Sequence, residues 1–144
     1  VEFDELLAKS AIISLHCPLT GETSRMFSAP QLAAMNDGTI LVNTCRGEIF
    51  NQGDLIAALE SGKLGGYATD VVEGEPIGAD HVLLGTRNVI VTPHLGGYSV
   101  VSLRGMGQTM VDDMCRVFVE KGFPGVIANE TIDLATSRIA RFRA

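Results

Sequence analysis

The sequence predicts an α/β protein with a Rossmann-like, doubly wound parallel sheet that is incomplete. Two observations lead to this prediction. Short apolar segments without polar alternation recur at four places along the 144 residues, which is typical of strands buried on both faces of a parallel sheet. Amphipathic segments with helical spacing lie between them, and such alternation of strand and helix indicates a doubly wound α/β fold.

The expected elements follow one another along the chain. Residues 1–10 are expected to form a helix that leads into a strand. The four strands are predicted at residues 11–15, 39–43, 66–70 and 88–91. Helices are predicted at residues 29–35, 52–61 and 99–120. In the helix over residues 52–61, Leu55, Ile56 and Leu59 share one face and Gly62 follows as a stop signal.

The helix over residues 99–120 carries a long apolar stripe. Its members recur at steps of three and four residues and are Leu103, Met106, Met110, Met114, Val117 and Phe118. A methionine-rich stripe can line a ligand site, but at helical spacing it is more often a packing face. We therefore predict that this face packs against a core.

Composition excludes several classes of protein. The 17 acidic residues outnumber the 11 basic residues and give a net charge of −6, which disfavours nucleic acid and membrane surfaces as partners. The three cysteines, Cys17, Cys45 and Cys115, are an odd number at wide spacings, which fits neither a disulfide framework nor a paired metal site. We predict a cytoplasmic protein without a metal.

Three segments place functional side chains directly after predicted strands, where open α/β sheets gather their ligands. They span residues 43–47, 70–76 and 92–97. Arg46 could present its planar fork to a carboxylate, although a loop arginine is often only solvated. His94 with Glu75 could form an acid–base pair, although a lone histidine is often structural.

The other reactive side chains are less informative. His16 is placed to line a groove at a strand end, and His81 is expected in an exposed loop without a chemical role. Cys45 precedes Arg46, but no base is placed to generate its thiolate, so a small groove-lining role is favoured. The motifs of serine hydrolases, zinc proteases and phosphate-binding loops are absent from the sequence.

Four ordered motifs between Leu6 and Asn129 resemble the D-isomer-specific 2-hydroxyacid dehydrogenases, which include D-lactate, D-glycerate and D-3-phosphoglycerate dehydrogenases. The motifs are SLHCPLT at residues 14–20, LVNTCRG at 41–47, GYATDV at 66–71 with Glu75 and Pro76, and VTPHLGG at 91–97.

This resemblance implies an oxidoreductase that transfers a hydride between a nicotinamide cofactor and a small D-2-hydroxy acid or 2-oxo acid. Arg46 would bind the substrate carboxylate and polarise the reacting carbonyl. His94 would be the acid and base, and Glu75 rather than Glu73 would hold it.

The same resemblance implies that NAD is the cofactor, with NADP not excluded. Its predicted binding residues lie in all four motifs and are Cys17, Pro18, Thr44, Cys45, Arg46, Asp70, His94, Gly96 and Gly97. Asp70 would accept a hydrogen bond from the carboxamide, and the two glycines would let the backbone pass close to the nicotinamide. Tyr98 follows at a position where the family often has small hydroxyl residues. The resemblance therefore does not define the shape of the substrate pocket.

The expected organisation also follows from the resemblance. Residues 1–122 would be the C-terminal part of a dinucleotide-binding domain that carries the catalytic residues, and residues 123–144 would return to a substrate domain. The glycine-rich turn for the pyrophosphate is absent, as is the N-terminal segment that builds the substrate domain, so the 144 residues alone are expected to be inactive. Members of the family are usually homodimers, so the resemblance also implies a homodimer for this protein.

Three alternatives stay open at this point. One is a related dehydrogenase that acts on formate, phosphite or glyoxylate, because these enzymes share Arg46, Glu75 and His94. A second is a non-catalytic interaction protein that senses NAD, as related transcriptional corepressors do. A third is an inactive fragment, which would gain no stability from the cofactor.

Overall fold

The computed structural model describes residues 1–122, and the predicted return segment at 123–144 lies outside the described residues. The chain divides into two compact units, Val1–Gly96 and Gly97–Ala144. The first unit holds the whole sheet and the loops that carry the predicted site.

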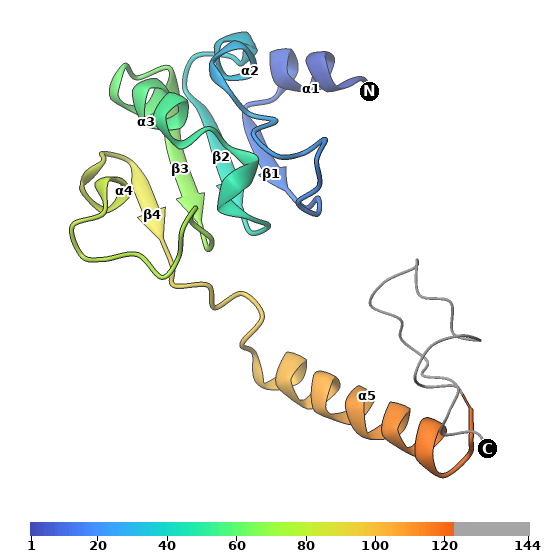
Figure 1. Cartoon of the computed structure of the whole chain (residues 1–144). Helices are drawn as coiled ribbons and strands as arrows, with labels where there is room; N and C mark the ends of the chain where they lie inside the picture. Colours follow the sequence, from blue (N-terminus) through green and yellow to red (C-terminus); the bar gives the residue numbers. More distant parts are fainter. Residues whose placement is uncertain (123–144) are drawn as a thin grey trace. The chain divides into compact units, whose positions relative to one another are not determined.

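The sheet of the first unit has four parallel strands in the order of the sequence (Figure 1). They are β1 (Ile12–Leu15), β2 (Thr39–Asn43), β3 (Leu64–Thr69) and β4 (Val89–Val91). In the register of the sheet Leu15 pairs with Asn43, Asn43 with Thr69, and Thr69 with Val91. The last residues of all four strands therefore form one row, and the loops that follow them leave from a single edge.

The helices of the first unit connect these strands. They are α1 (Phe3–Lys9), α2 (Ala29–Ala34), the 3₁₀ turn η1 (Gly47–Ile49), α3 (Gln52–Glu60) and α4 (Val82–Gly85). Asn51 begins α3 by accepting hydrogen bonds from the backbone N–H groups of Gly53 and Asp54, and Gly62 follows its end with φ of +77°. The predicted strands and longer helices agree with the observed ones to within about two residues.

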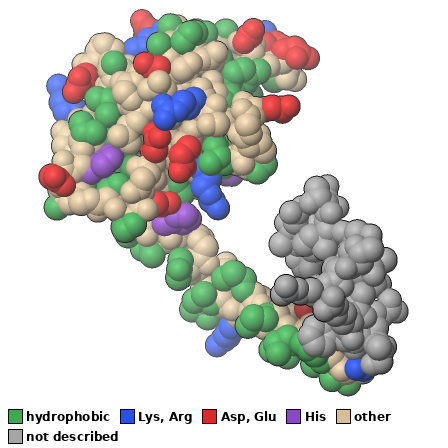
Figure 2. All heavy atoms as spheres, in the orientation of Figure 1, with side chains coloured by type: hydrophobic (Ala, Val, Ile, Leu, Met, Phe, Trp, Pro, Cys, Tyr) green, Lys and Arg blue, Asp and Glu red, His purple; other side chains and the backbone are tan. Residues whose placement is uncertain are grey.

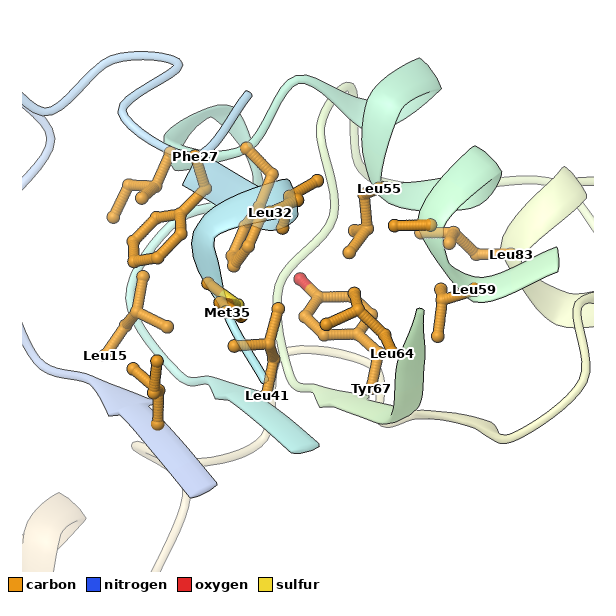
Figure 3. Packing of buried hydrophobic residues seen from close by; sticks show 14 of the residues in the cluster. Leu15, Phe27, Leu32, Met35, Leu41, Leu55, Leu59, Leu64, Tyr67 and Leu83 are labelled. Carbon is orange, nitrogen blue, oxygen red and sulfur yellow. The ribbon is translucent and has the colours of Figure 1, made fainter. Parts of the chain in front are cut away.

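The core lies between one face of the sheet and the helices (Figure 3). Leu32 from α2 and Leu55 from α3 are almost fully buried, together with Leu41 and Tyr67 from the strands. The rings of Phe27 and Phe50 stack with centroids 4.9 Å apart, and Phe50 meets Tyr67 edge-on at 5.4 Å. Aromatic contacts of this kind stabilise a core beyond their buried area.

Within the first unit the strands are buried on one face, whereas the sequence predicts burial on both faces. Ile13, Leu15 and Leu41 are buried, whereas the alternate residues Ile12 and Ile40 are exposed. The reason is that the helices α1, α2 and α3 contribute their buried leucines to a single core cluster with the inward-facing strand residues. Ile90 of β4 is also exposed, so the helices of the first unit cover one face of the sheet.

His81 lies in a loop, as predicted, but it is less exposed than predicted. It is half-buried, and its side chain accepts a hydrogen bond from the backbone N–H of Leu83 at 3.3 Å, so it begins the short helix α4. The sequence analysis did not predict α4 because four residues are too few for a helical period to show.

The second unit contributes the helix α5 (Val100–Phe118), which Ser99 begins by accepting a hydrogen bond from the backbone N–H of Ser102. Within its apolar stripe Val117 is buried, whereas Leu103, Met106 and Met110 are exposed. The packing role of this stripe therefore stays a prediction. No described helix is long and apolar enough to cross a membrane.

Candidate active site

The candidate site consists of the loops that leave the carboxyl edge of the sheet. Segment 16–19 follows β1, segment 44–47 follows β2, segment 70–76 follows β3 and segment 92–96 follows β4. The common row at the strand ends brings these four segments, widely separated in sequence, to one edge.

His94 and Glu75 are in direct contact. His94 Nδ1 lies 2.7 Å from Glu75 Oε1, as the sequence predicts, and both side chains are partly exposed. An ionised carboxylate can only accept, so Nδ1 carries the hydrogen of this bond. His94 Nε2 makes no hydrogen bond within residues 1–122, and this nitrogen is left to exchange a proton with another molecule.

The backbone of His94 has φ of +54°, in the left-handed region that few residues other than glycine adopt. Its N–H donates to the carbonyl oxygens of Asp70 and Thr92 at 2.9 and 3.0 Å. The loop after β4 is thus held against the end of β3, and these contacts stabilise the uncommon conformation of His94.

Glu73 has a different partner from Glu75. Its carboxylate accepts from Arg25 Nη2 at 3.0 Å, and Arg25 also donates its backbone N–H to the Glu48 carbonyl oxygen. Arg25 therefore joins the loop after β1 to the loops after β2 and β3. This ion pair leaves Glu75 as the glutamate of this segment that contacts His94.

Asp70 holds the loop after β4 in place. It is buried, and its carboxylate accepts from the backbone N–H groups of Leu95 at 2.8 Å and Gly96 at 2.7 Å and from the Thr92 hydroxyl. Burial by itself would raise the pKa of Asp70, but the hydrogen bonds from Thr92, Gly96 and Leu95, with the charge of His94, lower it below its ordinary value. Asp70 is therefore an anion, with acceptor capacity left at Oδ2.

The two predicted glycines of this loop have different surroundings. A Cβ atom on Gly96 would lie 3.0 Å from Asp70 Oδ2, so the glycine permits the close approach of its N–H to that carboxylate. This is a structural reason for Gly96 beside the predicted one. Gly97 belongs to the second unit, and its predicted role stays a prediction.

Asn43 shapes the loop that carries Arg46. Its fully buried side chain donates to the Arg46 carbonyl oxygen at 2.9 Å and to the Tyr67 hydroxyl at 3.2 Å, and accepts from the Cys45 N–H at 3.0 Å. These bonds use both ends of the amide, so residues 44–46 are tied to the end of β2. Asn43 lies within the motif at residues 41–47, but no role for its side chain was predicted from the sequence.

Gly47 lets this loop pack against the next one. A Cβ atom on Gly47 would lie 2.0 Å from the backbone nitrogen of Glu73 and 2.3 Å from the carbonyl carbon of Val72. No side chain fits in that space. Gly47 is therefore required for the close approach of this loop to the backbone after β3.

An open pocket of about 540 Å³ lies at the ends of β1 and β2. It brings together five of the predicted site residues, along with His16 and Leu19; the five are Cys17, Pro18, Thr44, Cys45 and Arg46. Its volume is within the range of sites for small ligands and cofactors. Asp70, Glu75 and His94 belong to the loops after β3 and β4 and are not among its lining residues.

Arg46 is exposed at the pocket and lacks an acidic partner within residues 1–122. Its Nη1 donates to the carbonyl oxygen of Cys45 at 2.6 Å. The rest of the guanidinium is available to a ligand and could form two parallel hydrogen bonds with a carboxylate. No hydrogen bond joins Arg46 to Glu75 or His94 in the described part of the chain.

Together these side chains have the groups that reversible proton and carboxylate chemistry needs. A histidine with one free nitrogen lies beside a glutamate, an anionic aspartate holds their loop, and an unpaired guanidinium lines a pocket at the same sheet edge. No group of three or more His, Cys, Asp or Glu side chains in residues 1–122 is arranged to hold a metal ion.

Comparison with known proteins identifies relatives of this chain. A hydroxypyruvate reductase from Blautia hydrogenotrophica is 47% identical over 95 residues, which are 66% of this chain and 30% of that protein. The chain therefore spans less than a third of the length of this relative.

Solved structures give the same result. The NAD-complexed D-isomer specific 2-hydroxyacid dehydrogenase from Lactobacillus delbrueckii ssp. bulgaricus matches with a TM-score of 0.81 and 32% identity, covering 90% of this chain and 43% of that one. A D-isomer specific 2-hydroxyacid dehydrogenase from Xanthobacter autotrophicus Py2, in complex with NADPH and MES, matches with a TM-score of 0.73 and 34% identity over 85% of this chain and 49% of that one.

The sheet, its loops and these similarities agree with the motifs in the sequence. The family model described as "D-isomer specific 2-hydroxyacid dehydrogenase, NAD binding domain" matches residues 1–96, which is the whole of the first unit. The chain belongs to the family of NAD-binding domains of D-isomer specific 2-hydroxyacid dehydrogenases.

Proposed function

We propose that this chain is the catalytic-residue-bearing part of an oxidoreductase that interconverts a small D-2-hydroxy acid and its 2-oxo acid with a nicotinamide cofactor. The observation that carries the proposal is the 2.7 Å contact between His94 and Glu75 at the sheet edge that also holds Arg46. Family membership supports it, and the relatives include a hydroxypyruvate reductase.

In this proposal His94 moves the proton. With Nδ1 hydrogen-bonded to Glu75, Nε2 of the imidazolium donates a proton to the substrate carbonyl oxygen during reduction and takes it from the hydroxyl during oxidation. Glu75 fixes the orientation of the ring and stabilises its charged form. Glu73 has no part in this step because it pairs with Arg25.

Arg46 binds the substrate. Its guanidinium has no acidic partner within the described residues and lines the open pocket, which suits recognition of the carboxylate of a 2-oxo acid. The same positive charge polarises the adjacent carbonyl group. Asn43 and Gly47 are positioning residues, because they fix the loop on which Arg46 lies.

The pocket residues fit the nicotinamide end of a dinucleotide. Cys17, Pro18, Thr44 and Cys45 line a space of suitable volume, and anionic Asp70 has an acceptor site left for a carboxamide N–H. A bound nicotinamide dinucleotide supplies the hydride for reduction and accepts it in oxidation. NAD is the cofactor we propose, and NADP stays an alternative, since one similar structure holds NADPH.

The organisation of the whole protein is also proposed. Residues 1–122 belong to the dinucleotide-binding domain, and residues 123–144 return to a substrate domain. The family resemblance supports a homodimer, and the net charge of −6 disfavours nucleic acid or membrane partners. The odd number and wide spacing of the three cysteines fit no disulfide framework, which supports a reducing compartment such as the cytoplasm.

Turnover with a panel of substrates tests the proposed function. The purified protein that carries this chain is mixed with NADH or NADPH and with glyoxylate, pyruvate or hydroxypyruvate, and absorbance at the reduced-cofactor band is followed. We expect turnover with at least one 2-oxo acid, and a D-configured product where pyruvate or hydroxypyruvate is reduced. Cofactor binding without turnover of any of these 2-oxo acids would contradict the proposal that the protein is an enzyme. It would favour a cofactor sensor.

Arg46→Lys tests the carboxylate-binding role separately. Lysine keeps the charge but loses the two-pronged donor geometry, so KM for the 2-oxo acid should rise by about tenfold or more. Arg25→Lys is the matched control, because Arg25 pairs with Glu73 rather than lining the pocket. An unchanged KM in Arg46→Lys would remove Arg46 from the substrate site.

A further inference from the structure

Two cysteines from neighbouring loops line the open pocket together. Cys17 lies two residues beyond Leu15, the end of β1, and Cys45 lies two residues beyond Asn43, the end of β2. Leu15 and Asn43 are paired in the parallel register, so the two cysteines occupy equivalent places after adjacent strands. Neighbouring strands are about 4.8 Å apart, and disulfides bridge Cα atoms about 4.4 to 6.8 Å apart.

The two thiols also interact with each other. Both cysteines are half-buried and both line the pocket. The pKa of the Cys45 thiol is raised mainly by burial, while the backbone and side chain of Cys17 are further influences on it. The Cys17 side chain is thus near enough to Cys45 to affect its ionisation, as a partner in a bond must be.

The loops that carry both cysteines are tied to fixed parts of the fold. The Cys45 N–H donates to the side chain of Asn43 at 3.0 Å. After Cys17, the carbonyl oxygen of Pro18 accepts from the Thr23 hydroxyl at 2.7 Å. Two thiols held close on ordered loops lose little freedom when they join, which favours a bond between them over separate adducts.

We propose that Cys17 and Cys45 form a reversible intramolecular disulfide, which makes the pocket a redox modification site. The oxidant we name is a low-molecular-weight disulfide such as oxidised glutathione. This modification requires only the two thiols and that oxidant, so it does not depend on the proposed enzymatic function.

The chemistry proceeds by two thiol–disulfide exchanges. The thiolate of Cys17 attacks one sulfur of oxidised glutathione, a mixed disulfide forms, and one glutathione leaves as a thiolate. The thiolate of Cys45 then attacks the Cys17 sulfur, the protein disulfide forms and the second glutathione leaves. The two protons lost by the cysteines go to the two glutathione thiolates, so the two cysteines are oxidised and one glutathione disulfide is reduced.

The raised pKa of Cys45 is consistent with this order. A thiol whose pKa is raised has less thiolate at neutral pH and is a poorer first attacker on a free oxidant. The nearby positive charge of Arg46 partly opposes the effect of burial. In the second step Cys45 faces a sulfur that is already bound beside it, and proximity replaces a high thiolate fraction.

The consequence for function rests on the proposed function. If the pocket receives the nicotinamide end of the cofactor, a bond between Cys17 and Cys45 joins two of its walls beside Arg46. The oxidised protein should then bind NADH more weakly, and reduction with dithiothreitol should restore binding. Oxidation would thereby switch the enzyme off without any change in its catalytic residues.

Disulfide mapping tests the proposal directly. The folded protein is equilibrated in buffers with graded ratios of oxidised to reduced glutathione, quenched in acid, alkylated, digested and analysed by mass spectrometry. We expect the Cys17 and Cys45 peptides to be lost together at one midpoint and to reappear as a single cross-linked species, lighter by two hydrogens than their sum. In Cys115→Ser protein the same cross-link should form, because Cys115 is exposed on α5 and has no part in it.

Single variants and cofactor binding complete the test. In Cys17→Ser or Cys45→Ser protein, the remaining cysteine should form only a glutathione adduct. Independent oxidation of Cys17 and Cys45 to separate adducts, or a cross-link of either to Cys115, would overturn the proposal. A Cys17–Cys45 cross-link that leaves NADH affinity unchanged would support the disulfide and contradict the assignment of this pocket to the cofactor.

Discussion

The two halves of the sheet edge differ in how many contacts within the chain hold their functional side chains. After β3 and β4, Asp70 accepts three hydrogen bonds, Glu75 contacts His94, and the backbone N–H of His94 donates to two carbonyl oxygens. After β1 and β2, the pocket is open and Thr44 is exposed, and within residues 1–122 Arg46 donates only to the carbonyl oxygen of Cys45.

Under the proposed function, the two halves have different tasks. The proposed proton transfer needs its groups in place before the reaction, which fits the internal contacts of the histidine half. The proposed recognition of a ligand needs groups without internal partners, which fits the guanidinium and exposed side chains of the pocket half. Substitutions in the two halves should therefore separate effects on chemistry, on folding and on binding.

The largest expected effect comes from His94→Gln. Removal of a general acid and base lowers rates by about 10² to 10⁴, so we expect kcat to fall by about 10³ and NADH affinity to change far less. His81→Gln is the matched control, because the His81 side chain accepts a hydrogen bond at the start of α4 and lies outside the site. Steady-state kinetics with cofactor titrations measure both quantities. A His94→Gln protein with nearly full kcat would contradict the role of His94 as general acid and base.

The next largest effect is expected at Gly47, where the loop after β2 packs against the loop after β3. Gly47→Ala would place a methyl group 2.0 Å from the backbone of Glu73, and we expect a loss of about 3 kcal/mol in the free energy of unfolding. Denaturant unfolding measures it. Gly53→Ala in α3 is the control, since its Cβ meets nothing closer than 3.5 Å and alanine favours a helix. Equal stability of the two variants would contradict the close packing of these loops.

Asp70→Asn should have a smaller effect that depends on pH. The amide cannot replace the anion that accepts three hydrogen bonds, so at pH 7 we expect a loss of about 2 kcal/mol in the free energy of unfolding. Because the pKa of Asp70 is lowered on folding, its contribution is present above the ordinary value of 3.8 and is lost as the pH falls through the folded-state pKa.

Unfolding at pH 7 and near pH 3 separates this contribution from packing. The difference between the wild-type protein and Asp70→Asn should shrink at the lower pH, and exposed Asp80→Asn should show little difference at either pH. A gap between wild type and Asp70→Asn that is the same at both pH values would show that the charge of Asp70 does not hold the loop.

The smallest expected effect on folding is in the pocket half. Thr44 is exposed, so Thr44→Ala should change the free energy of unfolding by less than about 0.5 kcal/mol. If Thr44 donates to the cofactor, NADH affinity should nevertheless fall by about fivefold. Thermal unfolding and a fluorescence titration on the same sample compare the two. A large loss of stability in Thr44→Ala would contradict the proposed difference between the two halves of the sheet edge.

Much of the fold could be predicted because its signals are local. The strand that ends at Asn43 and the helix that Asn51 begins each have an apolar pattern and a terminating residue in the sequence. The single covered face of the sheet could not be predicted from the strands alone, because Ile12 and Ile40 are as apolar as Ile13 and Leu41. Which face the helices cover is a property of the connections, not of the strand composition.

The candidate site was partly predictable for the same reason. Arg46, Glu75 and His94 each follow a strand within a motif, so their common edge follows from a parallel sheet. The bonds from Asn43 to the Arg46 loop, and the contact of Gly47 with Val72 and Glu73, depend on tertiary distances that no spacing in the sequence encodes. The likeness of positions 17 and 45 after adjacent strands became visible only with the register.

The most direct test of the proposed function measures whether Glu75 acts through His94. The quantities are kcat/KM values for the wild-type protein, Glu75→Gln, His94→Gln and the double variant, with Glu73→Gln as the control that loses only the pair with Arg25. If the two residues form one proton-transfer unit, Glu75→Gln should lower kcat/KM by about 10-fold to 100-fold in the wild-type background and change it little once His94 is glutamine. Multiplication of the two single effects in the double variant would contradict a shared role.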